Sequence, residues 1–156
     1  MTEKVIQGNI FDSEATIISQ QVNNQGVMGS GVAKQVKERY PRVFEKYRSA
    51  YEKGYLKLGT CQVVDVDGTK RQFIANLCGQ DKYGYDGKRY TSYDAIYTAL
   101  EKLAKYCLDN KIESIAFPWG MSSDRGGADW NVIITMIESV FKNNENITVE
   151  YWKYNV

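Results

Sequence analysis

Short apolar runs rich in β-branched residues alternate with segments of helical periodicity along most of the chain. The runs favour strands, because they are short and several of them end at Asn, Asp, Gly or Pro. They are Val5–Gln7, Ala15–Val22, Leu58–Val66, Arg71–Leu77, Ser114–Phe117 and Ile147–Trp152. The helical segments are Gly31–Tyr40, Val43–Tyr51, Thr91–Leu108 and Trp130–Phe141. This alternation predicts an α/β fold of three αβα layers, in which helices cover both faces of a mixed, mainly parallel central sheet.

Local signals refine this prediction. Asp67-Gly68 between two predicted strands is typical of a hairpin turn, so these strands should pair antiparallel. Thr91 followed by Asp94 fits a capping box at the start of the third predicted helix. Residues 79–89 hold three glycines among tyrosines and charges, which is typical of a long surface loop. The length of 156 residues predicts a single domain over residues 1–156.

Charge and side-chain chemistry exclude several classes of function. Twenty basic against nineteen acidic residues leave a formal charge of +1, which argues against a nucleic acid or a membrane surface as partner. The chain has no histidine, which excludes Ser-His-Asp and Cys-His nucleophile systems and histidine-bound metals. Its three cysteines are widely spaced without a CxxC motif. This pattern fits neither a zinc site nor a disulfide framework, and it favours a reducing cytoplasm.

The segment from Asn23 to Ala33 leaves a predicted strand and enters a predicted helix through Gly29-Ser30-Gly31. Small residues let a ligand approach the backbone closely, and the free N–H groups and dipole of a helix start favour an anion such as phosphate. An ordinary tight connection is the alternative. Both interpretations stay open on this loop alone, because a lone glycine cluster is a weak motif.

A second loop of the same kind runs from Pro118 to Trp130, again between a predicted strand and a predicted helix. If both strands are central and parallel, the two loops meet at one edge of the sheet and can clasp a diphosphate between them. Neither loop has the Gly-Lys-Ser/Thr of a Walker A motif or the GxGxxG of a dinucleotide fold. Ordinary nucleotide triphosphatases and Rossmann dehydrogenases are therefore disfavoured.

Charged residues of the second loop are candidates for chemistry. Asp129 directly precedes the last predicted helix and fits an N-cap, which does not exclude a catalytic role. Asp124 is either a turn residue or a carboxylate that faces the ligand. Arg125 either pairs with a phosphate or points into water. Spacing does not choose between these alternatives.

Aromatic residues gather in two places outside the most regular predicted helices. Tyr83, Tyr85 and Tyr90 lie in the middle loop, where they could form a lid over a ligand. Tyr151 and Trp152 lie at the end of the last predicted strand, where a ring can stack on a base. Core packing or plain surface exposure is the alternative for each of these side chains.

Four short motifs follow one another along the chain. They are Gln7-Gly8-Asn9-Ile10, Met28-Gly29-Ser30-Gly31-Val32-Ala33, Ala75-Asn76-Leu77 followed by Gly79-Gln80, and Pro118-Trp119-Gly120 continuing to Gly127-Ala128-Asp129-Trp130. In this order and spacing, the chain resembles the macrodomains. Within that family it is similar to the small single-domain branch of ADP-ribose-1''-phosphate phosphatases and of enzymes that remove ADP-ribose from glutamate. The resemblance covers nearly the whole chain and implies a macrodomain-like fold.

The resemblance implies that ADP-ribose lies across the carboxyl edge of the sheet. The adenine is expected beside Gly8, Asn9, Ile10 and Trp152. The diphosphate is expected between the two loops, at Met28, Gly29, Ser30, Gly31, Val32, Ala33, Pro118, Gly120, Met121, Ser122 and Ser123. The distal ribose is expected beside Asn23, Asn24 and Gln80. The resemblance implies no metal and no cofactor, and it allows an ADP-ribosylated protein as partner.

Three positions depart from the family pattern. Asn9 stands where the family usually has Asp, so a neutral amide replaces a charged acceptor for the adenine amino group. Gln80 stands where the glutamate-directed enzymes have a lysine that attacks the ribose, and an amide cannot form their covalent intermediate. Ser122-Ser123-Asp124 stands where the branch commonly has Gly-Cys-Gly, which brings bulkier side chains, one of them acidic, near the expected distal phosphate or ribose.

These residues lead to a first functional hypothesis. We expect a hydrolase that acts on an ADP-ribose derivative at the distal ribose, with Asp129 or Asp124 activating water and Asn23 or Asn24 positioning the ribose. The alternative is a module that binds ADP-ribose or a related nucleotide without turnover. A single-stranded RNA binder is disfavoured, because the chain has neutral charge and no basic stripe.

Overall fold

The computed structural model describes residues 1–84, 86 and 88–154. Its elements follow the chain in this order: β1 (Thr2–Gln7), a 3₁₀ turn η1 (Ile10–Asp12), β2 (Ile17–Asn23), α1 (Gly31–Arg39), α2 (Pro41–Glu52), β3 (Cys61–Asp65), β4 (Phe73–Gln80), α3 (Tyr93–Asp109), β5 (Ser114–Pro118), α4 (Trp130–Phe141) and β6 (Thr148–Lys153). Each predicted strand and helix is therefore present, with ends that differ by a few residues.

The strands form one sheet in the order β1-β6-β5-β2-β4-β3. In the middle of the sheet, β2 pairs parallel with both β4 and β5, and β6 pairs parallel with β5 and β1. Among the described strands only β3 runs antiparallel, paired with β4 across the turn that contains Asp67-Gly68. The structure thus confirms the mainly parallel sheet and the predicted hairpin.

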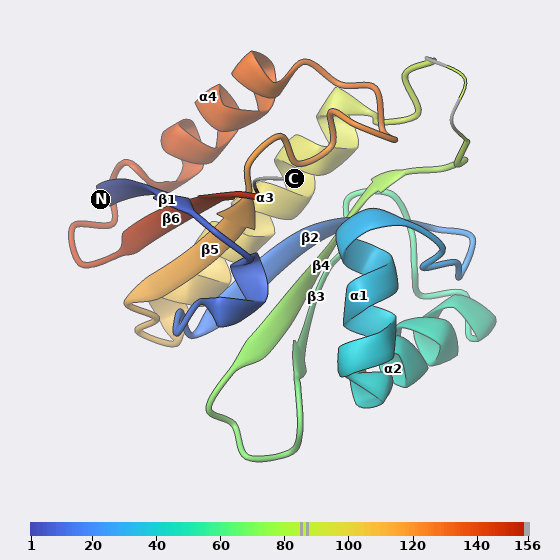
Figure 1. The fold of residues 1–156 in the computed structure, drawn as a ribbon, viewed down its shortest axis with the longest axis horizontal. Helices are drawn as coiled ribbons and strands as arrows, with labels where there is room; N and C mark the ends of the chain where they lie inside the picture. The colour runs from blue at the N-terminus through green and yellow to red at the C-terminus, as the bar shows by residue number, and fades with distance from the viewer. Residues whose placement is uncertain (85, 87, 155–156) are drawn as a thin grey trace.

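Two layers of apolar side chains attach the helices to the sheet. α3 and α4 cover one face, where Ile96, Leu100 and Ile137 are fully buried. α1 and α2 cover the opposite face, where Val43 and Tyr47 are fully buried. Figure 1 shows the two helix pairs on opposite sides of the strands, which confirms the predicted three layers.

Proline separates the first two helices as predicted. α1 ends before Tyr40, and Pro41 occupies the first position of α2, where its missing N–H costs no hydrogen bond within the helix. None of the helices in the described part of the chain is long and apolar enough to cross a membrane.

The predicted capping box at the start of α3 is wrong in its first residue. The N-cap is Ser92, whose side chain accepts a hydrogen bond from the backbone N–H of Ala95. Thr91 is drawn away from the helix, because its hydroxyl contacts Gln21 and the Ser122 carbonyl. Its backbone forms a β-bridge with Gln80. A partner far away in the sequence therefore overrides the local capping signal.

The expected surface loop also begins later than predicted. β4 continues through Gly79 and Gln80, which are both buried. A Cβ atom at position 79 would collide with the side-chain amide of Gln21 on the neighbouring strand. Glycine here therefore permits close packing between strands and does not mark a loop.

We expect the buried face of α3 to account for most of what this helix contributes to the stability of the protein. Leu100→Ala leaves a cavity against the sheet and should lower the free energy of unfolding by about 2–5 kcal/mol. Leu108→Ala on the same helix is the matched control, since Leu108 is 56% exposed and its loss should change stability by less than about 0.5 kcal/mol. Urea unfolding measures both, and equal losses would contradict this assignment of the buried face.

Candidate functional site

A groove crosses the carboxyl edge of the sheet, where α1 and α4 begin. It consists of three adjoining hollows that share lining residues. The middle lies between the first loop (residues 24–30) and the second loop (residues 119–129). The tyrosine end contains Asn23 and Tyr83, and the tryptophan end contains Trp119 and Trp152. Ser30 lines both the middle and the tyrosine end, and Gly31 lines both the middle and the tryptophan end. The three hollows are therefore continuous.

Most of the predicted site residues line this groove. They are Gly8, Asn9, Ile10, Asn23, Gly29, Ser30, Gly31, Val32, Ala33, Gln80, Pro118, Gly120, Met121, Ser122, Asp124 and Trp152. Four predicted site residues are not among the lining residues, namely Asn24, Met28, Ser123 and Asp129. The structure therefore brings together the two loops, as predicted, but separates the two candidate carboxylates.

Asn23 shapes the first loop from the end of β2. Its amide nitrogen donates to the Val27 carbonyl at 2.8 Å, and its Oδ1 accepts from the Gln25 N–H at 2.9 Å. From α2, the Tyr47 hydroxyl donates to the Asn23 carbonyl at 2.6 Å and to Oδ1 at 2.8 Å. Burial raises the pKa of Tyr47, so the phenol stays protonated and remains a donor. Asn23 is thus held by the protein before any ligand arrives.

Asn24, the next residue, is not among the residues that line the groove. Its N–H donates to the Gln80 carbonyl at 3.1 Å, and its Oδ1 accepts from the Gln25 side-chain amide at 2.9 Å. Met28 in the same loop is buried in the core beneath α1 and α2. Both residues therefore support the first loop, which itself presents its backbone to the groove.

The start of α1 is open toward the groove. Ser30 occupies the N-cap position without a capping hydrogen bond from its side chain. Gly31 has φ +60, and no atom lies within 4 Å of the place where a Cβ would stand. The first-turn N–H groups of a helix have no partner within the helix and carry partial positive charge. This geometry suits an anion, which is one of the two interpretations that the sequence left open.

The second loop turns tightly opposite α1. Gly120 has φ +80, and its carbonyl accepts from the N–H and from the hydroxyl of Ser123. Ser122 has φ +71, a left-handed conformation that suits glycine better than serine. This position is one of those where the resemblance expects glycine. A serine therefore stands here in a backbone conformation that favours glycine.

Gln21 joins β4, the middle loop (residues 81–92) and the second loop. Its amide nitrogen donates to Gln80 Oε1 at 2.9 Å and to Thr91 Oγ1 at 2.8 Å. Its Oε1 accepts from the Ser122 hydroxyl at 2.6 Å. Sequence analysis did not single out Gln21, although a polar side chain inside an apolar strand run was the available signal. This amide connects β2, β4 and both later loops at one point.

Both ends of the Gln80 side-chain amide form hydrogen bonds within the protein. Its Oε1 accepts from Gln21, and its Nε2 donates to the Lys82 carbonyl at 2.8 Å. The residue is buried at the end of β4. An amide in this arrangement supports the wall of the groove and supplies no nucleophile.

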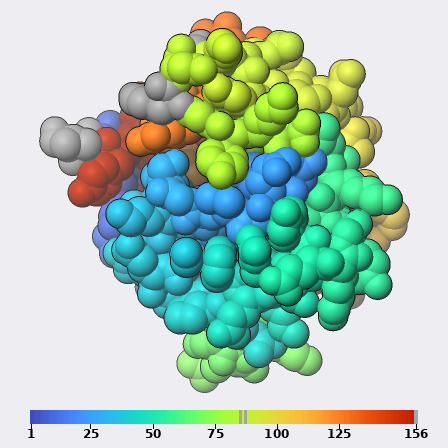
Figure 2. All heavy atoms as spheres, turned by 90° about the vertical axis from the view of Figure 1, so that its right-hand side faces the viewer, coloured from blue at the N-terminus to red at the C-terminus, as the bar shows by residue number. Residues whose placement is uncertain are grey.

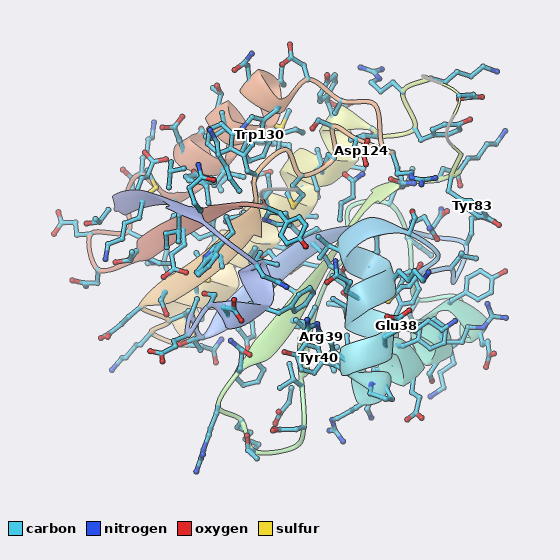
Figure 3. All side chains as sticks on the ribbon, viewed as in Figure 1. Glu38, Arg39, Tyr40, Tyr83, Asp124 and Trp130 are labelled. Carbon is cyan, nitrogen blue, oxygen red and sulfur yellow. The ribbon has the colours of Figure 1, made fainter. Side chains whose placement is uncertain are left out.

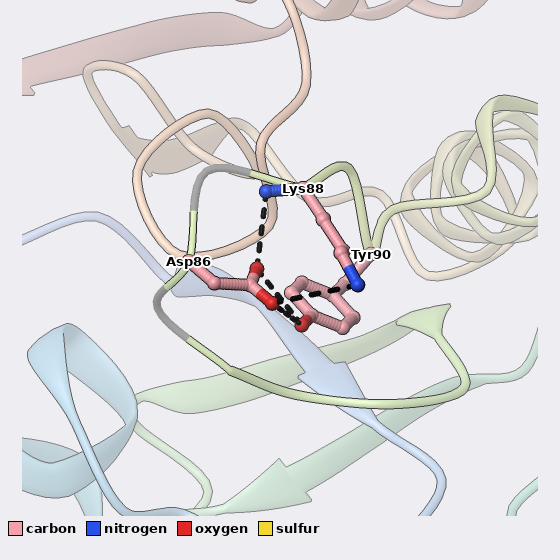
Figure 4. Close-up of polar contacts among 3 residues, drawn as sticks. All are labelled: Asp86, Lys88 and Tyr90. Atoms are coloured by element: carbon pink, nitrogen blue, oxygen red, sulfur yellow. Dashed lines mark hydrogen bonds and ion pairs between the residues drawn. The ribbon is translucent and has the colours of Figure 1, made fainter.

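The middle loop is held against the second loop. The N–H groups of Tyr90 and Thr91 both donate to the Gly126 carbonyl, at 2.8 and 2.9 Å. Asp86 accepts from the Tyr90 hydroxyl at 2.9 Å and from the Lys88 N–H at 3.1 Å (Figure 4). These hydrogen bonds lower the pKa of Asp86, the one from the Lys88 N–H most, and the carboxylate in turn raises the pKa of Tyr90.

Two of the three tyrosines expected to form a lid have different roles in the structure. Tyr83 is exposed and lines the tyrosine end, whereas Tyr90 contacts Asp86. Tyr85 lies outside the described residues. Figure 2 shows the middle loop, in lime, above the blue residues that lead from β2 into α1. The loop therefore borders the tyrosine end from above.

The two candidate carboxylates of the second loop occupy different environments. Asp124 is exposed and lines the middle of the groove beside Arg125. Asp129 caps α4, as predicted, because its side chain accepts from the Asn131 N–H at 2.9 Å. The Asp129 N–H donates to the Tyr93 hydroxyl at 2.9 Å. Figure 3 shows Asp124 and Tyr83 at the same end of the molecule, above the start of α1.

The tryptophan end presents flat apolar surface. Lys153 lies with its Nζ 4.0 Å from the centre of the half-exposed Trp119 ring, and Trp152 lies beneath Gly8, whose added Cβ would stand 3.3 Å from the indole. Asn9 Oδ1 accepts from the Phe11 N–H at 3.0 Å and caps the 3₁₀ turn. Indole faces of this kind suit a planar ring.

The expectation that Tyr151 stacks on a base is wrong. Its ring is buried between α4 and the sheet, and its hydroxyl donates to Glu3 Oε2 at 2.9 Å. Side chains alternate along a strand, so Tyr151 and Trp152 face opposite sides of β6. Trp152 alone of these two lines the groove.

The three cysteines are free thiols that are buried or partly buried. Burial raises the pKa of Cys78 to about 12, so this thiol stays protonated inside the core at neutral pH. Within residues 1–84, 86 and 88–154, no group of three His, Cys, Asp or Glu side chains is arranged to hold a metal ion.

Comparisons with known proteins agree with this geometry. The family model described as "Macro domain" matches residues 20–137. A curated relative from Mycobacterium tuberculosis, named "DNA ADP-ribosyl glycohydrolase", is 30% identical over 138 residues, which cover 86% of this chain and 37% of the relative. The chain thus spans less than two fifths of the length of that relative. Its name contains DNA, so the expectation against a nucleic acid partner is not borne out by this comparison.

Solved structures share the fold. The macrodomain of Mycobacterium tuberculosis DarG has a TM-score of 0.85 and 24% identity, with 97% of each chain covered. Thermosipho africanus DarTG in complex with ADP-ribose has a TM-score of 0.82 and 19% identity, with 97% of this chain and 42% of that chain covered. At these identities, the likeness shows the three-layer fold alone. The ligand of this chain has to be inferred from its own residues.

Tyr47 should be the strongest single support of the first loop. Tyr47→Phe leaves the oxygens of Asn23 without their buried donor, so it should lower the free energy of unfolding by about 1–3 kcal/mol. Tyr55→Phe removes the same hydroxyl from a side chain that is 71% exposed, and it should change stability by less than about 0.5 kcal/mol. Guanidinium unfolding measures both, and an unchanged Tyr47→Phe midpoint would refute the role given to this hydroxyl.

Proposed function

The chain belongs to the Macro domain family, and on that premise we propose that it binds ADP-ribose along the groove and hydrolyses an ADP-ribose derivative at the distal ribose. One observation carries the proposal: two glycine-containing loops face each other across the carboxyl edge, with the open start of α1 between them. A diphosphate needs donors on both sides and close approach to backbone, and this arrangement supplies both.

The three parts of the groove match the three parts of ADP-ribose. We assign the adenine to the tryptophan end, where Trp119 and Trp152 offer flat apolar faces. The diphosphate then lies in the middle, next to the N–H groups of α1 and to Arg125. The distal ribose reaches the tyrosine end beside Asn23, whose orientation Tyr47 holds.

Asp124 is the carboxylate that we propose for the reaction. It lines the middle of the groove, which adjoins the tyrosine end at Arg125, whereas Asp129 is occupied as the N-cap of α4 outside the groove lining. As a general base, Asp124 takes a proton from water while the water oxygen bonds to the electrophilic atom of the linkage at the distal ribose. The bond from that atom to the leaving group breaks, and Asp124 returns the proton to the leaving group, which restores the carboxylate. Gln80 supplies no nucleophile, so this route needs no covalent intermediate.

We infer that ADP-ribose attached to DNA is the first derivative to test. The relative from Mycobacterium tuberculosis at 30% identity is named for that linkage. The net charge of the chain does not argue against this substrate. A basic charge is needed for binding to the phosphate backbone of DNA, whereas here the attached ADP-ribose would provide the affinity. ADP-ribose-1''-phosphate, O-acetyl-ADP-ribose and ADP-ribosylated protein are the other candidates that the sequence suggested.

A binding module without turnover is the second candidate function. The observation that favours it is Gln80, which stands where the resemblance expects a lysine and whose amide is hydrogen-bonded to Gln21 and to the Lys82 carbonyl. In such a module the groove would recognise ADP-ribose, and Asp124 would only border it. Turnover by the wild-type protein therefore decides between the two functions.

Gly31→Glu should abolish ADP-ribose binding. The new carboxylate would enter the phosphate site, where like-charge repulsion costs several kcal/mol and weakens Kd by at least about 100-fold. Gly54→Glu is the matched control, since Gly54 has a similar φ of +75, equal free space and no place in the groove. Calorimetry with ADP-ribose compares them, and unchanged affinity in Gly31→Glu would exclude the diphosphate site.

Asp124→Asn should keep ADP-ribose affinity and lower turnover by about 10²–10⁴-fold, because the amide cannot accept a proton from water. Asp129→Asn keeps an N-cap for α4, so its turnover should match the wild type. Release of ADP-ribose from an ADP-ribosylated oligonucleotide, ADP-ribose-1''-phosphate and O-acetyl-ADP-ribose measures the rates. Wild-type protein that binds ADP-ribose but acts on none of these would instead support the binding module.

A further inference from the structure

Three side-chain amides form a continuous ladder across the sheet beneath α1 and α2. Gln20 on β2, Asn76 on β4 and Gln62 on β3 are direct neighbours in the strand register. Gln20 Nε2 donates to Asn76 Oδ1 at 2.8 Å, and Asn76 Nδ2 donates to Gln62 Oε1 at 3.0 Å. Gln62 Nε2 donates to the Lys46 carbonyl of α2 at 3.1 Å. Each amide thus donates in the same direction.

The Lys46 carbonyl determines that direction. A carbonyl oxygen only accepts, so Gln62 must turn its NH₂ group toward it and its oxygen toward Asn76. Asn76 must then present its NH₂ group to Gln62 and its oxygen to Gln20. By the same logic Gln20 uses its NH₂ group on Asn76. The free end of the ladder is therefore an oxygen, Gln20 Oε1.

This free end coincides with the middle of the groove. Gln20 is only 2% exposed, yet it is one of the residues that line the middle, below the start of α1 and the second loop. Within the described part of the chain, Gln20 Oε1 has no hydrogen-bond partner. A buried acceptor without a donor is costly, and such groups are rare in folded proteins. The oxygen itself is covered, so a ligand in the middle of the groove can supply the donor once the Gln20 side chain turns toward it.

We propose that Gln20 Oε1 accepts a hydrogen bond from a ribose hydroxyl of the bound ligand, an inference that rests on the proposed function. Phosphate oxygens are acceptors at neutral pH and cannot supply the donor. The adenine amino group is assigned to the tryptophan end, away from Gln20. The ribose hydroxyls are the remaining O–H donors of ADP-ribose, and both riboses flank the diphosphate. Gln20 therefore distinguishes a ribose from a sugar that lacks this hydroxyl.

Gln20→Met tests the proposal, because it keeps the length of the side chain and removes the acceptor. Calorimetry compares wild type and variant with ADP-ribose, with ADP, which carries only the ribose next to adenine, and with 2'-deoxy- and 3'-deoxy-ADP. Ser19→Ala is the matched control. It removes a second buried polar group of β2, a hydroxyl that lacks a partner among the described residues and does not line the groove.

We expect Gln20→Met to weaken ADP-ribose binding by about 3- to 10-fold and Ser19→Ala to leave it unchanged. If the hydroxyl belongs to the ribose next to adenine, ADP binding weakens equally, and a deoxy analogue is insensitive to the substitution. If it belongs to the distal ribose, only ADP-ribose binding weakens. Either pattern supports the proposal and identifies the ribose.

If wild type and Gln20→Met bind ADP-ribose with equal affinity, this inference is wrong and the proposed function stands. If the wild type does not bind ADP-ribose, both the inference and the proposed function are wrong. Equal weakening toward ADP and both deoxy analogues also overturns the inference, since that pattern reports a disturbed phosphate site. Thermal unfolding verifies that Gln20→Met is folded, because Asn76 Oδ1 loses its donor. If that variant does not fold, Gln20→Asn replaces it in the same comparison, because its shorter side chain moves the amide oxygen back by one methylene.

Discussion

Parallel pairing of β2 with both β4 and β5 is the constraint on which the rest of the structure depends. Parallel strands end at the same edge of a sheet, so the chain leaves the sheet side by side after Asn23, Gln80 and Pro118. The three segments that follow must therefore share one small area. Small residues let them pass each other, as at Gly126, where a Cβ would collide with Gln21, Thr91 and the second loop itself. The groove is the space that remains between these segments.

Neutral amides, more than charges, hold this edge together. Gln21 connects three segments by its own hydrogen bonds, and Gln20 ends a ladder that reaches α2. An amide carries a donor and an acceptor without a net charge, so it can be buried between strands at a lower cost than a carboxylate. The fixed direction of these amides then determines which atoms face a ligand. Asp124 and Arg125 add charge only at the wall of the groove.

Much of the fold and part of the site followed from local sequence signals. Hydrophobic periodicity predicted the strands and helices, and Asp67-Gly68 predicted the antiparallel hairpin. The N-cap at Asp129 and the glycine-rich start of α1 could also be predicted from the sequence, because each depends on a few consecutive residues. The errors share one cause. Thr91 and Tyr151 were assigned from their neighbours in sequence, whereas their partners lie on other elements.

The sequence by itself determined the three-layer class and the two loops that could meet at one edge, because strand and helix periodicity and glycine placement are local properties. Only the tertiary structure decided which side chains face the groove. Gln21 and Ser122 are 101 positions apart, and Gln20 and Asn76 are 56 apart, yet each pair is joined by a hydrogen bond. Such contacts depend on strand order and register, which arise when the whole sheet assembles and leave no local trace in the chain.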